Sequence, residues 1–398
     1  MKMRKIKLLF DVEQLSTDGL KGTGIVRVAD VLLQGLLKKE RIDIYPIITS
    51  KRGDFDRYLK EKGLYNTLKD KIIYLPKLKS TTKQVNWYQK IRSFCLTKWY
   101  GALYKKKLDK FDVYLSLFSP ISPIVYQSGV KTYMFIHDLI PIYYPDGCNP
   151  KFVEKFTSWI KNAKADGYFC VSNATLKDFL RFRKDEKKKK IIKLYLGADE
   201  KFRPSKEKEV IQLVKEKYHI PTKHYFLAVS EITARKNLPH LLKSFVQFLE
   251  KTKEQEVSLV LVGPKREGYE ALTNEIESLR KYQEKIIQTG YVDEADLPFL
   301  YQGATAFIYP SLYEGFGLPI LEAMQSGTAV ISADNTSLPE VGGDAVFYIT
   351  GLDEIETTQA LEKLYFDKNL NHRLRQKGLK RAQKFNWEKT IDTVSKRL

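Results

Sequence analysis

The chain has 398 residues, 43% of them hydrophobic and 12% aromatic, so it can build packed cores and wholesale disorder is excluded. Its length fits two domains, and no apolar run approaches the roughly 18 to 20 residues that a membrane-spanning helix needs. The net charge of +20 is unevenly divided: residues 1–200 carry 40 basic against 21 acidic side chains (+19), and the remainder carries 28 against 27 (+1).

Short apolar runs alternate with amphipathic stretches along the first half, which is typical of parallel α/β units. Residues 1–12 begin like a signal peptide, but Asp11 ends the apolar run well short of the roughly 7 to 15 residues of an export signal. We interpret this segment as a first strand and expect the protein in the cytoplasm. The predicted strands are 6–12, 42–48, 71–75, 113–117, 132–137 and 167–171, and the predicted helices include 26–38 and 152–164. Ser172 or Asn173 would cap the helix that follows the last of these strands.

The cysteines and histidines show no pattern typical of disulfide bonds or of a metal site. The three cysteines, Cys95, Cys148 and Cys170, are odd in number and form no CxxC pair, which favours reduced thiols. The five histidines form no HxH or HExxH pattern, so we expect no zinc or other metal.

The composition changes within residues 197–222, where Pro204, Pro221 and many charges predict a connection between domains. A second α/β series follows, with predicted strands at 225–229, 258–263, 286–289, 306–309, 329–332 and 346–349 and helices at 238–251 and 318–326. We therefore predict two doubly wound domains, 1–200 and 201–375, followed by a basic helical segment, 376–398. Sheets of this kind bind ligands beyond the carboxyl ends of their strands.

The strongest chemical signal is the sequence YPSLYEGFGLPILEAM at 309–324. A strand is followed by a turn with Glu314 and two glycines, and a helix then opens with Pro319 in its first turn. Free N–H groups at such a helix start form an anion site suited to phosphate. Glu322 lies about two turns into the helix, where it can face the same cleft, so two carboxylates could contact a sugar hydroxyl or a developing oxocarbenium charge. A capped helix with a solvated acid is the alternative.

This Glu-x7-Glu element inside residues 313–334, together with the Ala-Arg-Lys-Asn sequence at 234–237, resembles the retaining glycosyltransferase family 4. The Gly-Thr-Gly-Ile sequence at 22–25 and FIHDLIP at 135–141 also fit, and they are similar to members resembling mannosyl- and rhamnosyltransferases of bacterial surface polysaccharides. The resemblance spans nearly the whole chain and is most specific within 225–345. It implies a GT-B fold, in which two Rossmann-like domains face each other across a cleft and the C-terminal helix returns to the first domain.

The resemblance implies that Lys236 holds the donor diphosphate and offsets the charge of the leaving group. A lysine on a solvated helix start is the alternative. Many family members carry an arginine five or six residues earlier, where this chain has Ser230 and Glu231. Arg235 is the candidate to replace that charge.

Further roles on the donor side follow from the same resemblance. Glu314 matches the glutamate beside the donor sugar, and Glu322 matches the one that accepts hydrogen bonds from the ribose hydroxyls. The backbone that approaches sugar and phosphate would comprise Gly315, Phe316, Gly317 and Leu318. Val292 falls where family members contact the nucleobase, mostly through backbone, and a place in the core is equally consistent with its apolar side chain.

In the first domain, Gly24 lies in a strand-to-helix loop, where glycine lets the backbone approach a ligand phosphate. A simple turn residue is the alternative. His137 ends a strand at the edge where α/β sites form, and the family places a histidine there that contacts the donor sugar. Asp138 would either orient His137 or cap a turn.

The resemblance implies retaining, front-face transfer of a hexose from GDP-mannose or from a UDP- or dTDP-sugar to a glycan acceptor, lipid-linked, in cell-surface polysaccharide synthesis. The leaving phosphate would take the acceptor proton, so we expect no protein base, metal or other cofactor. The basic first domain would face an anionic membrane surface and a lipid-pyrophosphate-linked acceptor as a peripheral protein, although a generally lysine-rich surface also explains the charge. A catalytically inactive nucleotide-sugar-binding subunit is the alternative function. Charge alone suggests nucleic acid, and with no recognition helix or aromatic-rich RNA motif we expect no such partner.

Overall fold

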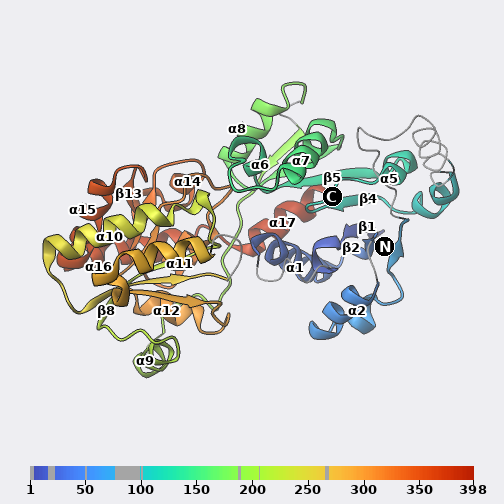
Figure 1. Cartoon of the computed structure of the whole chain (residues 1–398). Helices are drawn as coiled ribbons and strands as arrows, with labels where there is room; N and C mark the ends of the chain where they lie inside the picture. Colours follow the sequence, from blue (N-terminus) through green and yellow to red (C-terminus); the bar gives the residue numbers. More distant parts are fainter. Residues whose placement is uncertain are drawn as a thin grey trace.

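The computed structural model describes residues 4–16, 23–49, 52–76, 99, 102–186, 190–205, 207–264 and 269–398. Two lobes, each built around a parallel sheet, lie side by side in Figure 1. The predictions that concern Met1, Gly22 and Cys95 lie outside the described residues. Cys148 and Cys170 are free thiols.

The first sheet has seven strands in the order β3-β2-β1-β4-β5-β6-β7. Its strands are β1 (Ile6–Asp11), β2 (Ile42–Ile48), β3 (Ile73–Tyr74), β4 (Val113–Ser116), β5 (Lys131–Ile136), β6 (Gly167–Cys170) and β7 (Ile191–Lys193). The helices of this half are α1 (Gly24–Leu37), α2 (Arg52–Glu61), α3 (Tyr65–Leu68), α5 (Pro123–Ser128), α6 (Ile140–Tyr143), α7 (Pro150–Asn162) and α8 (Asn173–Phe182). Helix α1 buries Val28, Leu32 and Leu36, which share one face because they are four residues apart. Ser172 caps α8 by accepting a 3.0 Å hydrogen bond from the Thr175 amide.

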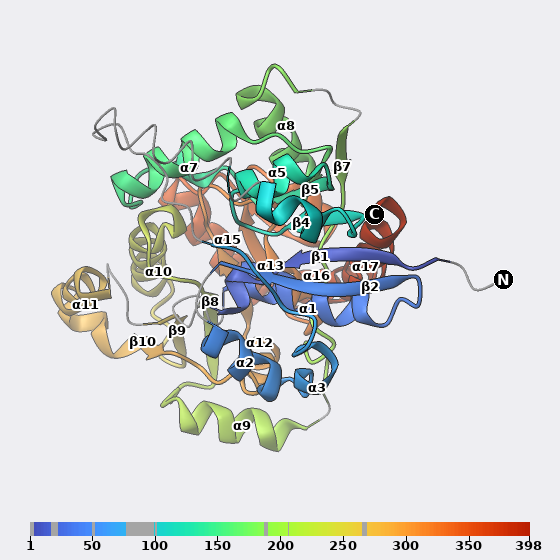
Figure 2. The same cartoon turned by 90° about the vertical axis from the view of Figure 1, so that its right-hand side faces the viewer.

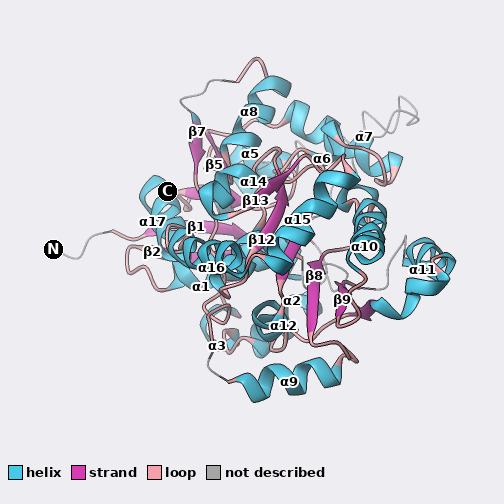
Figure 3. Cartoon of the chain, turned by 90° about the vertical axis from the view of Figure 1, so that its left-hand side faces the viewer, coloured by secondary structure: helices cyan, strands magenta, loops and turns pink. Residues whose placement is uncertain are grey.

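The second sheet has six strands in the order β10-β9-β8-β11-β12-β13, with helices on both sides (Figure 3). Its strands are β8 (His224–Val229), β9 (Val257–Val262), β10 (Ile286–Gly290), β11 (Ala306–Tyr309), β12 (Val330–Ala333) and β13 (Phe347–Ile349). Its helices are α9 (Lys208–Lys217), α10 (Leu238–Thr252), α11 (Tyr269–Ser278), α12 (Leu297–Gly303), α13 (Leu318–Gln325), α14 (Leu338–Gly342), α15 (Glu354–Phe366) and α16 (Lys368–Ala382). Every residue of β9 and β11 is buried, as expected for strands covered on both faces. The chain order reverses between β8 and β11, and such a switch point is where open α/β sheets bind ligands.

The last helix, α17 (Trp387–Arg397), crosses back to the first lobe, and Figures 1 and 2 both show it beside α1. Any side chain at Gly35 would overlap Ile391, so the two helices approach closely. The Tyr133 hydroxyl donates a 2.7 Å hydrogen bond to the Arg397 carbonyl. The predicted segment 376–398 therefore comprises the end of α16 and all of α17.

The predicted strands agree with the structure to within a few residues, with one omission. Strand β7 was not predicted, because its three residues at the edge of the sheet are exposed or only partly buried and carry a weak apolar signal. Across the described ranges, no helix is long and apolar enough to cross a membrane.

Candidate functional site

The candidate site lies where β8 and β11 end, at the switch point of the second sheet. Lys236 closes a short 3-10 turn, η4 (Ala234–Lys236), after β8, and Glu314 lies in the turn between β11 and α13. Asn237 follows with φ of 56°, a left-handed conformation that asparagine tolerates. Its side-chain amide donates a 2.6 Å hydrogen bond to the Gly351 carbonyl, which anchors the turn to the loop after β13.

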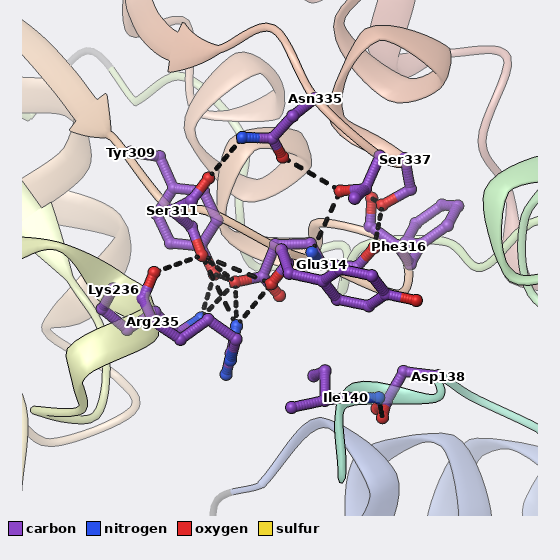
Figure 4. A network of polar contacts seen from close by, with 12 residues as sticks. Asp138, Ile140, Arg235, Lys236, Tyr309, Ser311, Glu314, Phe316, Asn335 and Ser337 are labelled. Carbon is purple, nitrogen blue, oxygen red and sulfur yellow. Dashed lines mark hydrogen bonds and ion pairs between the residues drawn. The ribbon is translucent and has the colours of Figure 1, made fainter. Parts of the chain in front are cut away.

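The Glu314 carboxylate is the centre of a buried polar cluster (Figure 4). Its Oε1 accepts hydrogen bonds from Lys236 Nζ at 2.6 Å, Ser311 Oγ at 2.6 Å and Tyr309 Oη at 2.9 Å, and it also pairs with the Arg235 guanidinium. Within the described ranges, Oε2 accepts none. Burial alone would raise the carboxyl pKa, but Lys236 and Arg235 together lower it to about 2, so Glu314 is ionised.

Two cations share this single carboxylate. Lys236 is buried, and its Nζ lies 4.7 Å from the centre of the Tyr309 ring and hydrogen bonds to the hydroxyl of that ring. Burial lowers the Lys236 pKa to about 8, against the attraction of Glu314. Arg235 also donates to the Tyr313 carbonyl at 2.8 Å. The further acids whose charge reaches these cations are Asp138, which acts on Arg235, and Glu231, which acts on Lys236. Two cations that converge on one carboxylate suit an additional anion.

A polar segment after β12 holds the Glu314 turn in place. The Glu314 amide donates to Thr336 Oγ1 at 3.0 Å, and Ser337 Oγ donates to the carbonyls of Glu314 and Phe316, both at 2.9 Å. Asn335 Nδ2 donates to the Ser311 carbonyl at 2.9 Å. This support was not predicted from the sequence, where its signal is a run of short polar side chains after a buried strand.

The two glycines of the turn, Gly315 and Gly317, are each required for a different structural reason. Gly317 has φ of 105° and is the N-cap of α13, a conformation that side chains disfavour. Any side chain at Gly315 would overlap the His137 carbonyl, so the turn lies directly against the first domain. Ser172 Oγ and Thr175 Oγ1 of that domain donate to the Gly315 carbonyl at 2.7 and 3.0 Å.

Two predicted contacts can offer only their backbone, because their side chains lie in the core. Phe316 packs against Tyr195 and Phe385, with ring centres 6.1 and 5.9 Å away. Val292 is buried in the same apolar cluster, whereas the preceding Tyr291 is 64% exposed.

His137 and Asp138 form the facing wall from the first domain. His137 Nε2 donates a 2.8 Å hydrogen bond to the Leu117 carbonyl, which leaves Nδ1 as the acceptor nitrogen of the ring. Burial lowers the His137 pKa to about 4, so the ring is neutral at physiological pH. Asp138 accepts a 3.0 Å hydrogen bond from the Ile140 amide at the start of α6. Burial raises the Asp138 pKa, which Arg235 opposes across the two domains.

Glu322 lies at a second polar contact between the domains. It is 3% exposed, its Oε2 accepts a 3.3 Å hydrogen bond from Tyr301 Oη, and its Oε1 pairs with Arg27 of α1. Gly24, at the start of α1, faces α13, and a Cβ there would lie 3.4 Å from Leu318 Cδ1. The structure thus brings the starts of α1 and α13 together. Arg27 was not predicted from the sequence as a site residue.

A third contact closes the outer edge of the two domains. Glu340 of α14 accepts hydrogen bonds from the Asn173 and Ala174 amides, at 2.8 and 2.7 Å, and so caps α8 of the first domain. Among the described residues, no three His, Cys, Asp or Glu side chains gather as metal ligands would.

Comparison with known proteins identifies the domain that carries the Glu314 cluster. Residues 210–381 match the family described as glycosyl transferases group 1. The serotype-specific mannosyltransferase WbdA of Escherichia coli is 29% identical over 266 residues, which cover 65% of this chain and 32% of that protein, so the chain spans about a third of that relative. The O-antigen chain mannosyltransferase B of Escherichia coli is 33% identical over 208 residues (52% of this chain and 54% of that protein). The O-antigen chain mannosyltransferase RfbU of Salmonella typhimurium is 24% identical over 355 residues (89% and 90%).

Solved structures with little sequence identity share the fold over nearly their whole length. Anabaena Alr3699/HepE, in complex with UDP and glucose, superposes with a TM-score of 0.73 at 14% identity, covering 98% of this chain and 99% of that one. WaaG, a glycosyltransferase involved in lipopolysaccharide biosynthesis, gives 0.66 at 12% identity, covering 97% and 98%. The chain therefore has the GT-B arrangement of two facing parallel-sheet domains and carries a group 1 glycosyltransferase domain.

Proposed function

We propose that this chain, with its group 1 glycosyltransferase domain, transfers a hexose from a nucleotide-diphosphate sugar to a glycan acceptor during synthesis of a bacterial cell-surface polysaccharide. One observation carries the proposal: Arg235, Lys236 and Glu314 meet at the carboxyl ends of β8 and β11, where α/β sheets bind ligands. The curated relatives described above are named mannosyltransferases, so GDP-mannose is the first donor to test, followed by UDP- and dTDP-sugars.

The diphosphate would bind between the two cations and the start of α13. Lys236 and Arg235 both pair with the single carboxylate of Glu314, and both would also pair with a phosphate of the donor. The helix start after Gly317 would add backbone N–H groups as donors to the diphosphate. As the sugar–phosphate bond breaks, negative charge grows on the leaving group, and fixed cations stabilise that charge more than they stabilise the ground state.

The donor sugar would hydrogen bond to the Glu314 carboxylate, and the ribose would hydrogen bond to the Glu322 carboxylate. All the described hydrogen bonds to the Glu314 carboxylate reach Oε1, so Oε2 would accept from a sugar hydroxyl. Glu322 would accept from the ribose diol. His137 would accept from the sugar at Nδ1, because its proton is held on Nε2 by the Leu117 carbonyl.

The reaction would proceed by front-face substitution with retention. A leaving phosphate oxygen would take the acceptor proton on the same face, so no protein base is required. His137 fits this assignment, because a neutral ring with a pKa of about 4 is a weak base at physiological pH.

The acceptor would approach from the basic first domain. The +19 charge of residues 1–200 favours an anionic, lipid-pyrophosphate-linked acceptor at the inner membrane surface, where the protein would bind peripherally. Sedimentation with anionic liposomes tests this part: binding at low salt that is lost at high salt supports it, and no binding at low salt removes it.

A thermal-unfolding screen of candidate nucleotide sugars tests the donor assignment, because a bound donor stabilises the folded state by mass action. We expect one nucleotide class to raise Tm in the wild type and not in Lys236→Ala. If no nucleotide diphosphate or nucleotide sugar raises Tm, the proposal is wrong. Donor binding without turnover toward any acceptor would favour an inactive binding subunit.

A further inference from the structure

Arg27 of α1 and Glu322 of α13 form a partly buried ion pair between the two domains. The Arg27 side chain is 21% exposed and the Glu322 side chain 5%. Arg27 lies one turn into α1. The first residue of that helix, Gly24, lies beside Leu318 at the start of α13. Arg27 is therefore the point at which the first domain reaches the carboxylate that the proposed function assigns to the ribose.

A carboxylate this deeply buried needs a cation to stay charged, because an unpaired buried acid protonates instead. Burial raises the Glu322 pKa, and Arg27 opposes this through its charge and its hydrogen bond. Tyr301 of α12 also donates a hydrogen bond to the carboxylate, and Lys201 acts on it through its charge. Tyr309 of β11 faces it as well, and Glu294 is the further acid that acts on Arg27. Lys201 is itself paired with Glu294 at 2.8 Å, so Arg27 is the main counter-ion.

We propose that Arg27 is a positioning residue for the donor nucleotide: it keeps Glu322 charged and oriented to accept hydrogen bonds from a ribose diol. The inference rests on the proposed function. A carboxylate has about four acceptor positions, and Arg27 and Tyr301 occupy one on each oxygen. One position on each oxygen therefore remains for the two hydroxyls of the diol. Hydrogen bonds to a charged acceptor are roughly twice as strong as those to a neutral one.

Because Arg27 comes from the first domain, the ribose site in the second domain is complete only while the domains are together. Donor affinity is then linked to domain closure.

The test is calorimetric titration of the whole chain with GDP and with UDP from about pH 6 to about pH 8.5. The variants are Arg27→Gln, Arg27→Lys and the control Lys39→Gln, whose lysine just after α1 pairs with Asp392 of α17 at 2.6 Å. The readout is affinity relative to wild type at each pH, so that titration of Lys236 and of the nucleotide cancels. We expect Arg27→Gln to bind roughly tenfold more weakly near pH 7 and to recover as pH rises and Glu322 ionises. Arg27→Lys should keep most of the affinity, and Lys39→Gln should match wild type.

Measurements in a Glu322→Gln background distinguish an effect of Arg27 on the charge of Glu322 from an effect of Arg27 on packing between the domains. If Arg27 acts through the charge of Glu322, adding Arg27→Gln to Glu322→Gln should cause no further loss of affinity. This comparison, together with Arg27→Lys, keeps the test open if Arg27→Gln alone folds poorly. Tm of each variant reports folding independently.

Three results would overturn the inference while leaving the proposed function standing. They are wild-type affinity in Arg27→Gln, a loss that is the same at every pH, and tighter binding, which would mean that Arg27 competes with the ribose. Failure of the wild type to bind either nucleotide would overturn the proposed function and this inference together.

Discussion

The two glutamates of the site are buried to a similar degree but are held in opposite ways. Glu314 is paired with two cations from its own domain, and its pKa falls to about 2. Glu322 is paired with one cation from the other domain, and its pKa is raised. The cations that pair with the first carboxylate belong to its own domain, whereas the cation that pairs with the second is in place only when the domains meet. The sugar and diphosphate of a donor would thus bind at a permanent site, formed by Arg235, Lys236 and Glu314 within one domain. The ribose would bind at a conditional site, formed by Arg27 and Glu322 from two domains.

The largest effect should come from breaking the permanent site at Lys236. We expect Lys236→Ala to lower kcat by about 10²- to 10³-fold, because it removes a fixed charge from the leaving group. Steady-state kinetics with the donor found in the screen would measure this. Lys243→Ala is the matched control, since Lys243 lies on α10 and is 60% exposed, beside Glu354. Equal losses in both variants would contradict the assignment.

Glu314→Gln should separate binding from turnover. The substitution frees Arg235 and Lys236 for phosphate, so we expect GDP or UDP affinity to be kept or increased while kcat falls by about 10²-fold. It also leaves buried cations with weaker compensation, and stability should fall by about 3 kcal/mol. Calorimetry, initial rates and denaturant unfolding measure the three quantities. A loss of nucleotide affinity equal to the loss of kcat would contradict a role in the chemistry.

The alkaline limb of the rate profile should report Lys236. Its pKa is about 8, so the side chain is charged below that pH and loses its charge above it. We expect kcat/KM, which reports the free enzyme, to fall about tenfold per pH unit above pH 8. An arginine stays charged throughout this range, so Lys236→Arg should remove the alkaline limb even if its overall rate is lower. Persistence of the same limb in Lys236→Arg would assign it to another group.

The residues of the permanent site were all predicted from the sequence, whereas of the conditional site only Glu322 was predicted. Lys236 and Glu314 both follow buried apolar strands, and neighbouring parallel strands end at the same edge of a sheet, so local patterns bring these residues together. Arg27 and Glu322 are 295 positions apart and meet only because two domains pack. The sequence around Arg27 contains no pattern that would predict its pairing with the Glu322 carboxylate.

For the strands and the core, too, local sequence patterns predicted some features, whereas others depend on how distant segments pack. The periodicity of apolar residues predicted twelve of the thirteen strands described in the structure, and the short edge strand β7 was the exception. For Val292 the sequence allowed either a nucleobase contact or a core position. The structure places its side chain in the core, and a nucleobase contact through its backbone stays a prediction.

The smallest effect should come from the outer contact between the domains, at Glu340. Its carboxylate caps α8 of the first domain, so Glu340→Ala removes hydrogen bonds to two amides and a favourable charge at a helix start. We expect a loss of about 1 kcal/mol in unfolding free energy and a slightly larger radius of gyration in solution scattering, because the loss falls on the closed arrangement. Glu356→Ala is the control: Glu356 accepts from the Thr350 amide and hydroxyl, both at 2.7 Å, within one domain. If both variants lose stability but neither changes the radius of gyration, Glu340 stabilises α8 without holding the domains together, and Arg27 would remain the main link between closure and the ribose site.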